Sequence, residues 1–146
     1  MNNIHVDCVL DAKANLGEGP IWSIKDQNLY WVDINNCQLC KFNPVNGENI
    51  TINVGKPIGC FAIKKNLNII LALTNGFFEL NQNDKSMNFI NNPETNILDN
   101  RFNDGTVDLK GRFYAGTMPI HGPNKKKGPK GSLYCLDHYG NVKKIM

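Results

Sequence analysis

A carboxylate between two glycines is the first residue of this 146-residue chain that could do chemistry. Glu18 stands in the segment Leu16-Gly17-Glu18-Gly19-Pro20. The glycines permit close backbone packing on both sides of the acid, and Pro20 stiffens the turn that follows. A carboxylate held in this way can be a metal ligand. The same pattern also fits a solvated acid in a loop, and the residues alone leave both interpretations open.

A second candidate group lies in the segment Arg101-Phe102-Asn103-Asp104-Gly105. If this segment is extended, its period of two places Arg101 and Asn103 on one side. Arginine supplies charge-assisted donors and asparagine supplies a donor and an acceptor, which suits a polyhydroxylated ligand. The alternative is a turn in which Asn103 and Asp104 cap backbone amides before Gly105.

The elements that must position these residues repeat along the chain. The similar segments are 21–25 with 29–34, 60–64 with 68–73, and 106–108 with 112–117. Taking Ile24, Ile63 and Val107 as equivalent gives steps of 39 and 44 residues. Steps of this size are typical of the blades of a β-propeller.

Each repeat predicts four strands joined by turns. The apolar runs 29–32 and 69–73 have consecutive apolar residues, so both faces of their sheets must be covered. The sequence predicts an all-β fold of the six-bladed β-propeller family with about three four-stranded blades. The expected bounds are about 19–54, 59–91 and 102–146, with residues 4–10 as a ring-closing strand. Six blades need roughly 250 to 300 residues, so we expect an N-terminal fragment, with a self-completing dimer as the alternative.

One equivalent position of the three repeats carries very different side chains. Four residues before Trp22, Phe61 and Gly105 stand Glu18, Pro57 and Arg101. A purely structural position should hold similar residues, whereas a site grafted onto a repeating scaffold should not. In a meander, the start of the first strand and the end of the second meet at one rim, where we expect the site.

Composition limits the remaining classes of function. The chain is 41% hydrophobic and 20% charged, with a net charge of +3, which is too weak for a nucleic-acid interface. The cluster Lys125 to Lys127 with Lys130 is expected to be a solvated loop. Without an export signal or a long apolar run, and with five cysteines in no regular framework, we expect a soluble cytoplasmic protein that does not bind membranes.

Two motifs resemble a known family. LGEGPIW at residues 16–22 and NRFNDGTVDLKGRFYAGTM at residues 100–118 are similar to signatures of the senescence marker protein, regucalcin and gluconolactonase family, which includes luciferin-regenerating enzymes. The resemblance implies a six-bladed propeller that holds one divalent cation in its central channel and hydrolyses sugar lactones. The cation would be calcium or zinc, with manganese or magnesium as other candidates.

The resemblance also assigns roles to residues. Glu18 matches a metal ligand of the family, and Arg101 and Asn103 match its substrate-binding residues. The other ligands, an Asn and an Asp, and the Asp that acts as acid or base, would lie beyond Met146. The chain departs from the family at His121, where some relatives carry a substrate-contacting acid; His121 either meets a sugar hydroxyl or has no role.

Two other classes of function remain. The first is a non-enzymatic, calcium-binding regulatory propeller of the regucalcin type. The second is a propeller that only binds other proteins. The open faces of the outer blades would also favour self-association and aggregation of the isolated 146 residues.

Overall fold

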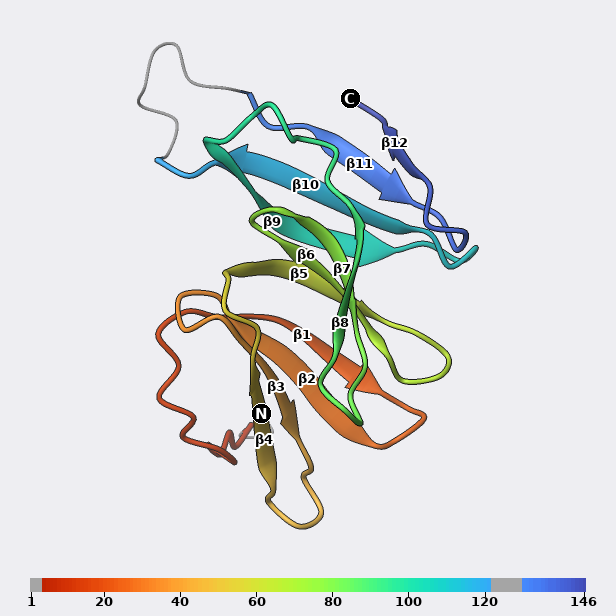
Figure 1. Cartoon of the computed structure of the whole chain (residues 1–146). Coiled ribbons are helices and arrows are strands. Elements are labelled where there is room, and N and C mark those ends of the chain that lie inside the picture. Colours follow the sequence, from red (N-terminus) through yellow and green to blue (C-terminus); the bar gives the residue numbers. More distant parts are fainter. Residues whose placement is uncertain (1–3, 122–129) are drawn as a thin grey trace.

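The three predicted repeats form three separate sheets. The computed structural model describes residues 4–121 and 130–146. Within these ranges, the twelve regular elements are all β-strands, arranged in three antiparallel sheets of four strands (Figure 1). The predicted all-β architecture with three four-stranded units is therefore confirmed.

Each sheet is a meander in which every strand pairs with the next along the chain. The first sheet contains β1 (Gly17–Ser23), β2 (Asn28–Asp33), β3 (Gln38–Phe42) and β4 (Asn49–Asn53). The second sheet contains β5 (Ile58–Ile63), β6 (Ile69–Leu73), β7 (Gly76–Leu80) and β8 (Met87–Asn91). The third sheet contains β9 (Asn100–Val107), β10 (Phe113–Pro119), β11 (Leu133–Leu136) and β12 (Val142–Lys144).

Short polar turns end the strands, and their side chains hold the backbone. In the turn between β9 and β10, Oδ1 of Asp108 accepts hydrogen bonds of 2.9 Å from the backbone amides of Lys110 and Arg112. Gly111 adopts a φ of 75°, which side-chain-bearing residues rarely take. Asp137 accepts the corresponding bonds in the turn between β11 and β12. Asp and Gly at these positions are the turn residues that separate the strands within a repeat.

The core lies between the sheets, as the consecutive apolar residues predict. On β6, Ile69, Leu71 and Leu73 belong to the cluster between the first and second sheets. Ala72 and the partly buried Ile70 belong to the cluster between the second and third sheets. Because β6 contributes to both clusters, both faces of its sheet are covered by neighbouring sheets.

The first strand of each sheet lies at the centre of the assembly, and β5 lies between β1 and β9 (Figure 1). At Gly59 of β5, a Cβ atom would lie only 2.3 Å from the backbone carbonyl of Phe102. Further along the same strands, Sγ of Cys60 would lie 2.7 Å from a Cβ at Gly105. The two strands therefore run in the same direction at close range. We call the side where β1, β5 and β9 begin the entry rim, and the other side the opposite rim.

Two segments lie outside the sheets. Residues 4–16 form no strand, so the ring-closing role of residues 4–10 and the exact blade bounds stay predictions. The expectation of a solvated loop at Lys125 to Lys127 concerns residues 122–129, outside the described ranges. Among the described residues, no helix has the length and apolar character needed to span a membrane.

Candidate functional site

Glu18 lies on the entry rim, as the second residue of β1. Its backbone pairs with Val32 of β2, and the regular pairing then breaks before Ile21, where the strand carries an extra residue. Gly19, at the break, has a φ of 60°. Bulges of this kind re-aim side chains and are common beside functional sites. The Glu18 side chain is exposed, and its carboxylate makes no hydrogen bond or ion pair with any described residue.

The start of this strand borders an apolar groove. The groove has a volume of about 440 Å³ and lies between the first sheet and the segment that precedes it. Leu10, Pro20, Trp31 and Phe42 line it together with Glu18. Glu18 is its only carboxylate among the lining residues described, so the groove supplies apolar surface and no further metal ligand.

A buried carboxylate fixes the backbone that leads into Glu18. Asp33, the last residue of β2, is only 2% exposed. It accepts hydrogen bonds from the backbone amides of Asn15 (2.9 Å) and Leu16 (3.1 Å), and from both the amide and the side chain of Asn36 (3.3 and 2.7 Å). Burial raises the pKa of Asp33, but these four hydrogen bonds outweigh it and hold the pKa below its usual value. The carboxylate is therefore charged, although no cation faces it in the described residues.

Arg101 and Asn103 lie at the start of β9, on the same rim. Phe102 between them is 3% exposed and packs against Phe77, with ring centroids 4.6 Å apart. Alternation along the strand directs Arg101 and Asn103 away from this core. Arg101 donates one hydrogen bond of 2.9 Å from Nη1 to the carbonyl of Phe102, and its other N–H groups bond to no other residue that the structure describes.

The turn interpretation of this segment applies to only one of its residues. Oδ1 of Asp104 accepts a hydrogen bond of 2.7 Å from the amide of Gly105. The Asn103 side chain is exposed and caps no amide in the described part of the chain. A break in the β9–β10 pairing falls between Phe102 and Gly105. Asp104 thus stabilises the bulge, whereas Asn103 projects from it.

A second buried carboxylate secures the entrance to β9. Glu94, in the segment between β8 and β9, is 8% exposed. Its Oε1 accepts hydrogen bonds from the hydroxyls of Thr117 (2.9 Å) and Tyr134 (3.0 Å). The Thr117 hydroxyl in turn accepts from the amide of Ser132 (2.9 Å). This network joins the segment before Arg101 to β10 and β11.

His121 is exposed and follows the end of β10 by two residues. The preceding residue, Ile120, donates a backbone hydrogen bond of 2.8 Å to the carbonyl of Asp99, which stands just before β9. This bond brings His121 to the same rim as Arg101. Its side chain forms no hydrogen bond with another described residue.

The four predicted site residues therefore share one rim, on three elements. β1 and β9 point the same way in Figure 1, and β10 ends on the side where they begin. Glu18 and Arg101 are not neighbours, because β5 separates their strands. The second sheet carries Pro57 just before β5 and Gly59 near the start of β5, and neither residue is charged. The first and third sheets thus supply the polar groups, and the second supplies close packing.

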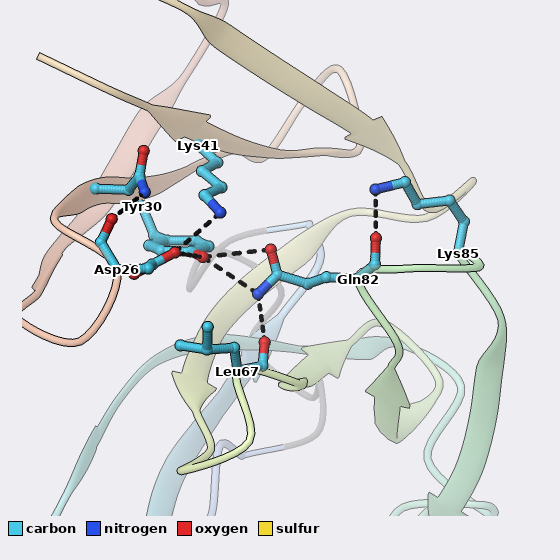
Figure 2. Close-up of polar contacts among 7 residues, drawn as sticks. Asp26, Tyr30, Lys41, Leu67, Gln82 and Lys85 are labelled. Carbon is cyan, nitrogen blue, oxygen red and sulfur yellow. Dashed lines mark hydrogen bonds and ion pairs between the residues drawn. The ribbon is translucent and has the colours of Figure 1, made fainter. Parts of the chain in front are cut away.

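A further polar cluster lies at the opposite rim and links the first two sheets (Figure 2). The Tyr30 hydroxyl donates to Oδ2 of Asp26 (2.7 Å), and Lys41 forms an ion pair with the same oxygen (2.9 Å). Gln82, from the second sheet, donates to the Tyr30 hydroxyl (3.2 Å) and to the carbonyl of Leu67. Partial burial raises the pKa of Asp26. Hydrogen bonds from Ser23, Lys41 and Tyr30 lower it by more, and the resulting pKa is about 2.

This cluster is structural in character. Its tyrosine is fully buried, and its hydrogen bonds join side chains across the boundary between two sheets. It is also remote from the entry rim, because Asp26 lies in the turn after β1. We therefore assign this cluster a role in the stability of the fold.

The donor set of the entry rim fits part of a metal site. Glu18 offers a carboxylate with no competing partner, which suits a hard divalent cation. The described residues contain no group of three or more His, Cys, Asp or Glu side chains that could hold a metal ion. Buried side-chain oxygens that lack a partner in the described residues occur at both rims, including Asn100 at the entry rim and Asp26 at the opposite rim, so they do not identify the site.

Comparison with known proteins identifies the family. Residues 16–146 match the family described as SMP-30/Gluconolactonase/LRE-like region. The chain belongs to this family. Regucalcin of Xenopus laevis is 36% identical over 141 residues, covering 94% of this chain and 47% of the relative. The 6-deoxy-6-sulfogluconolactonase of Pseudomonas putida is 35% identical over 116 residues, covering 80% of this chain and 40% of the relative.

Members of the SMP-30/gluconolactonase family also share the fold. The crystal structure of regucalcin from Agrobacterium tumefaciens, described as a calcium-binding protein, matches with a TM-score of 0.79 at 22% identity. The match covers 91% of this chain and 43% of that structure. The chain thus spans about half the length of the curated relatives it matches. The predicted family and its propeller-type fold are confirmed.

Sequence reasoning missed three residues that build this part of the family fold. Asp33 and Glu94 are buried carboxylates that hold the backbone before Glu18 and Arg101, and Gly59 lets β5 approach β9. The sequence does contain a signal for Asp33, because the second and third repeats carry Ala72 and Gly116 at the equivalent position. Comparing equivalent positions of the repeats, as was done for Glu18, would therefore have marked Asp33. No comparable signal marks Glu94.

Proposed function

We propose that this chain supplies part of the site of a metal-dependent sugar lactone hydrolase of the gluconolactonase type. In this proposal Glu18 is a ligand of one divalent cation, and Arg101, Asn103 and His121 bind the substrate. The observation that carries the proposal is the position of these residues on one rim of the inner strands, with the Glu18 carboxylate exposed and without a partner among the described residues. Membership of a family that includes a sulfogluconolactonase supports the substrate class.

The chain's own residues would bind and orient the lactone. The free N–H groups of Arg101 donate to ring or hydroxyl oxygens, and the Asn103 amide both donates and accepts. Because the Glu94 network and the Phe102 packing hold the start of β9, these groups are preorganised. A divalent cation bound at Glu18, with calcium or zinc as the leading candidates and manganese or magnesium as others, would polarise the lactone carbonyl and lower the pKa of a bound water towards neutrality.

The rest of the site would come from residues that are not in this sequence. We propose that an Asn and an Asp complete the cation's ligands and that a further Asp acts as acid or base. The relatives are about twice as long as this chain, which leaves room for these residues. The cysteines at positions 8, 37, 40, 60 and 135 are all free, which favours a reducing, cytoplasmic location.

A matched pair of variants tests the metal ligand in the natural full-length protein. Glu18→Gln keeps the shape of the side chain and removes its charge, so cation binding and lactone hydrolysis should weaken together. Glu48→Gln makes the same change on an exposed carboxylate in the turn between β3 and β4, at the opposite rim, and should change neither. Calorimetric titration with calcium and zinc measures the binding. Unchanged cation affinity in the Glu18 variant would reject the ligand role.

A second pair tests the substrate role. The chain has two arginines, Arg101 at the entry rim and Arg112 in the turn between β9 and β10. Arg101→Ala should lower kcat/KM for a sugar lactone while leaving cation affinity unchanged. Arg112→Ala should leave kcat/KM close to that of the natural protein.

The second candidate function is a calcium-binding regulatory protein without turnover. The regucalcins among the relatives, one of them described as calcium-binding, favour it. Assays of gluconolactone hydrolysis with calcium, zinc and manganese separate the two. Hydrolysis that depends on Glu18 supports the enzyme, whereas Glu18-dependent calcium binding without hydrolysis supports the regulatory protein.

A further inference from the structure

Asp33 holds the two residues that precede the strand of Glu18. Its two oxygens accept hydrogen bonds from the amides of Asn15 and Leu16, and the carbonyl of Leu16 accepts from the amide of Ile34 (3.0 Å). Both the amide and the carbonyl of Leu16 are therefore hydrogen-bonded to residues at the end of β2. The next contacts of this segment are the backbone pairings of Gly17 with Asp33 and of Glu18 with Val32.

We propose that Asp33 is a positioning residue for the Glu18 carboxylate, acting through the backbone of Asn15 and Leu16. This inference rests on the proposed function, in which Glu18 is a cation ligand. Glycines stand on both sides of Glu18, so its own segment has little intrinsic rigidity. The pairing of β1 also breaks just after Glu18, so on the N-terminal side the segment is held by the bonds to the Asp33 side chain and by the pairing of Gly17 with Asp33.

The anchor requires a group that only accepts hydrogen bonds. All four partners of Asp33 are N–H donors, and they come from Asn15, Leu16 and Asn36. A carboxylate can accept all of them, whereas an asparagine in its place turns one oxygen into a donor. That donor would face an N–H group in a site that is 98% buried, so one bond to the backbone must break.

A control for general destabilisation exists at the opposite rim. Asp26 also accepts hydrogen bonds from several donors, but these are the side chains of Ser23, Tyr30 and Lys41. Asp26→Asn therefore disturbs a charged, hydrogen-bonded group of the same sheet without touching the segment before Glu18. Any effect shared by the two variants reports stability, and any effect confined to Asp33→Asn reports positioning.

The first measurement is cation affinity of the natural full-length protein by calorimetric titration with calcium and with zinc. We expect Asp33→Asn to raise Kd about tenfold, as is typical when a group that orients a metal ligand is lost. Asp26→Asn should leave Kd unchanged. In the Glu18→Gln background, Asp33→Asn should have no further effect, because the ligand that it orients is gone.

The second measurement is hydrogen exchange at the amides of Asn15 and Leu16, without cation. Exchange should be faster in Asp33→Asn and unchanged in Asp26→Asn. If Asp33→Asn does not fold, Asn36→Ala loosens Asp33 while keeping its backbone bonds, and should produce smaller changes in both measurements. If the cation Kd and the exchange rates are both unchanged in whichever of these variants folds, the inference is overturned.

The outcomes separate the inference from the proposed function. Weaker cation binding in Glu18→Gln but unchanged binding in Asp33→Asn overturns the positioning role alone. Unchanged binding in Glu18→Gln overturns the proposed ligand role, and the positioning role with it. A tenfold loss in Asp33→Asn that disappears in the Glu18→Gln background supports both.

Discussion

The hydroxyl of Tyr30 lies 2.7 Å from Oδ2 of Asp26, and the same hydroxyl accepts a hydrogen bond from Gln82 of the second sheet. A single buried phenol thus connects a carboxylate of the first sheet to an amide of its neighbour. Hydrogen bonds to charged groups are stronger than neutral ones, and a buried partner left without one costs free energy. The contact should therefore contribute measurably to the packing of the two sheets.

Replacing Tyr30 by Phe tests this contribution. We expect the free energy of unfolding to fall by about 1 to 3 kcal/mol, because Asp26 and Gln82 both lose a partner. Denaturant unfolding followed by circular dichroism measures it. Tyr139→Phe is the matched control, since its side chain is 79% exposed and its hydroxyl bonds to no described residue. Equal stability of the two variants would show that the contact contributes nothing.

Asp26 should also make stability depend on pH in the acid range. Its pKa is about 2 in the folded chain, against an ordinary value of 3.8. Because the folded-state pKa is depressed, the stabilisation is complete above about pH 4 and is lost as the pH falls through 2. At neutral pH it amounts to about 2 kcal/mol. The difference in unfolding free energy between the natural protein and Asp26→Asn should shrink between pH 4 and pH 2, and a constant difference would refute this assignment.

At Gly59 the second and third sheets approach each other closely. A Cβ atom there would lie 2.3 Å from the carbonyl of Phe102, which is far inside van der Waals contact with rigid backbone. Gly59→Ala should therefore force β5 and β9 apart and destabilise the fold by at least about 1 to 3 kcal/mol. Gly116→Ala is the control, because its Cβ would meet nothing closer than 3.8 Å and its φ is not positive. Equal unfolding midpoints would contradict the close approach.

The buried carboxylate of Glu94 should be energetically coupled to Tyr134. The two are 40 residues apart in the sequence and are joined by a buried hydrogen bond of 3.0 Å. In a double-mutant cycle with Glu94→Gln and Tyr134→Phe, we expect a coupling free energy of about 0.5 to 3 kcal/mol. The cycle that combines Glu94→Gln with Tyr139→Phe should be additive. Additivity in both cycles would mean that the Glu94 network does not hold the entrance to β9.

The repeats and turns were predictable because their determinants are local. Short apolar runs, Asp and Gly turns such as Asp108 with Gly111, and steps of about 40 residues each lie within one segment. Consecutive apolar residues on β6 also predicted that both faces of its sheet are covered. The positions of Glu18 and Arg101 on one rim followed from the repeat alone.

The supporting contacts were not predictable, because they join distant segments. The bond from Asp33 to Leu16 spans 17 residues, and that from Glu94 to Thr117 spans 23. Nothing local to Gly59 indicates that the carbonyl of Phe102 lies beside it. An isolated Asp, Glu or Gly has many uses in a sequence, and only the packing of one sheet against the next selects among them.

His121 offers the sharpest test of substrate contact at the entry rim. If its ring donates to or accepts from a hydroxyl of the bound sugar, His121→Ala removes one hydrogen bond worth about 0.5 to 1.5 kcal/mol, which corresponds to a two- to tenfold change in binding. Because this bond would be equally strong in the ground state and the transition state, KM should rise and kcat should stay the same. His138→Ala is the matched control, since His138 is equally exposed but lies in the turn between β11 and β12, at the opposite rim. A KM unchanged in the His121 variant, measured with a sugar lactone, would remove His121 from the proposed site and leave Arg101 and Asn103 as its proposed substrate-binding residues.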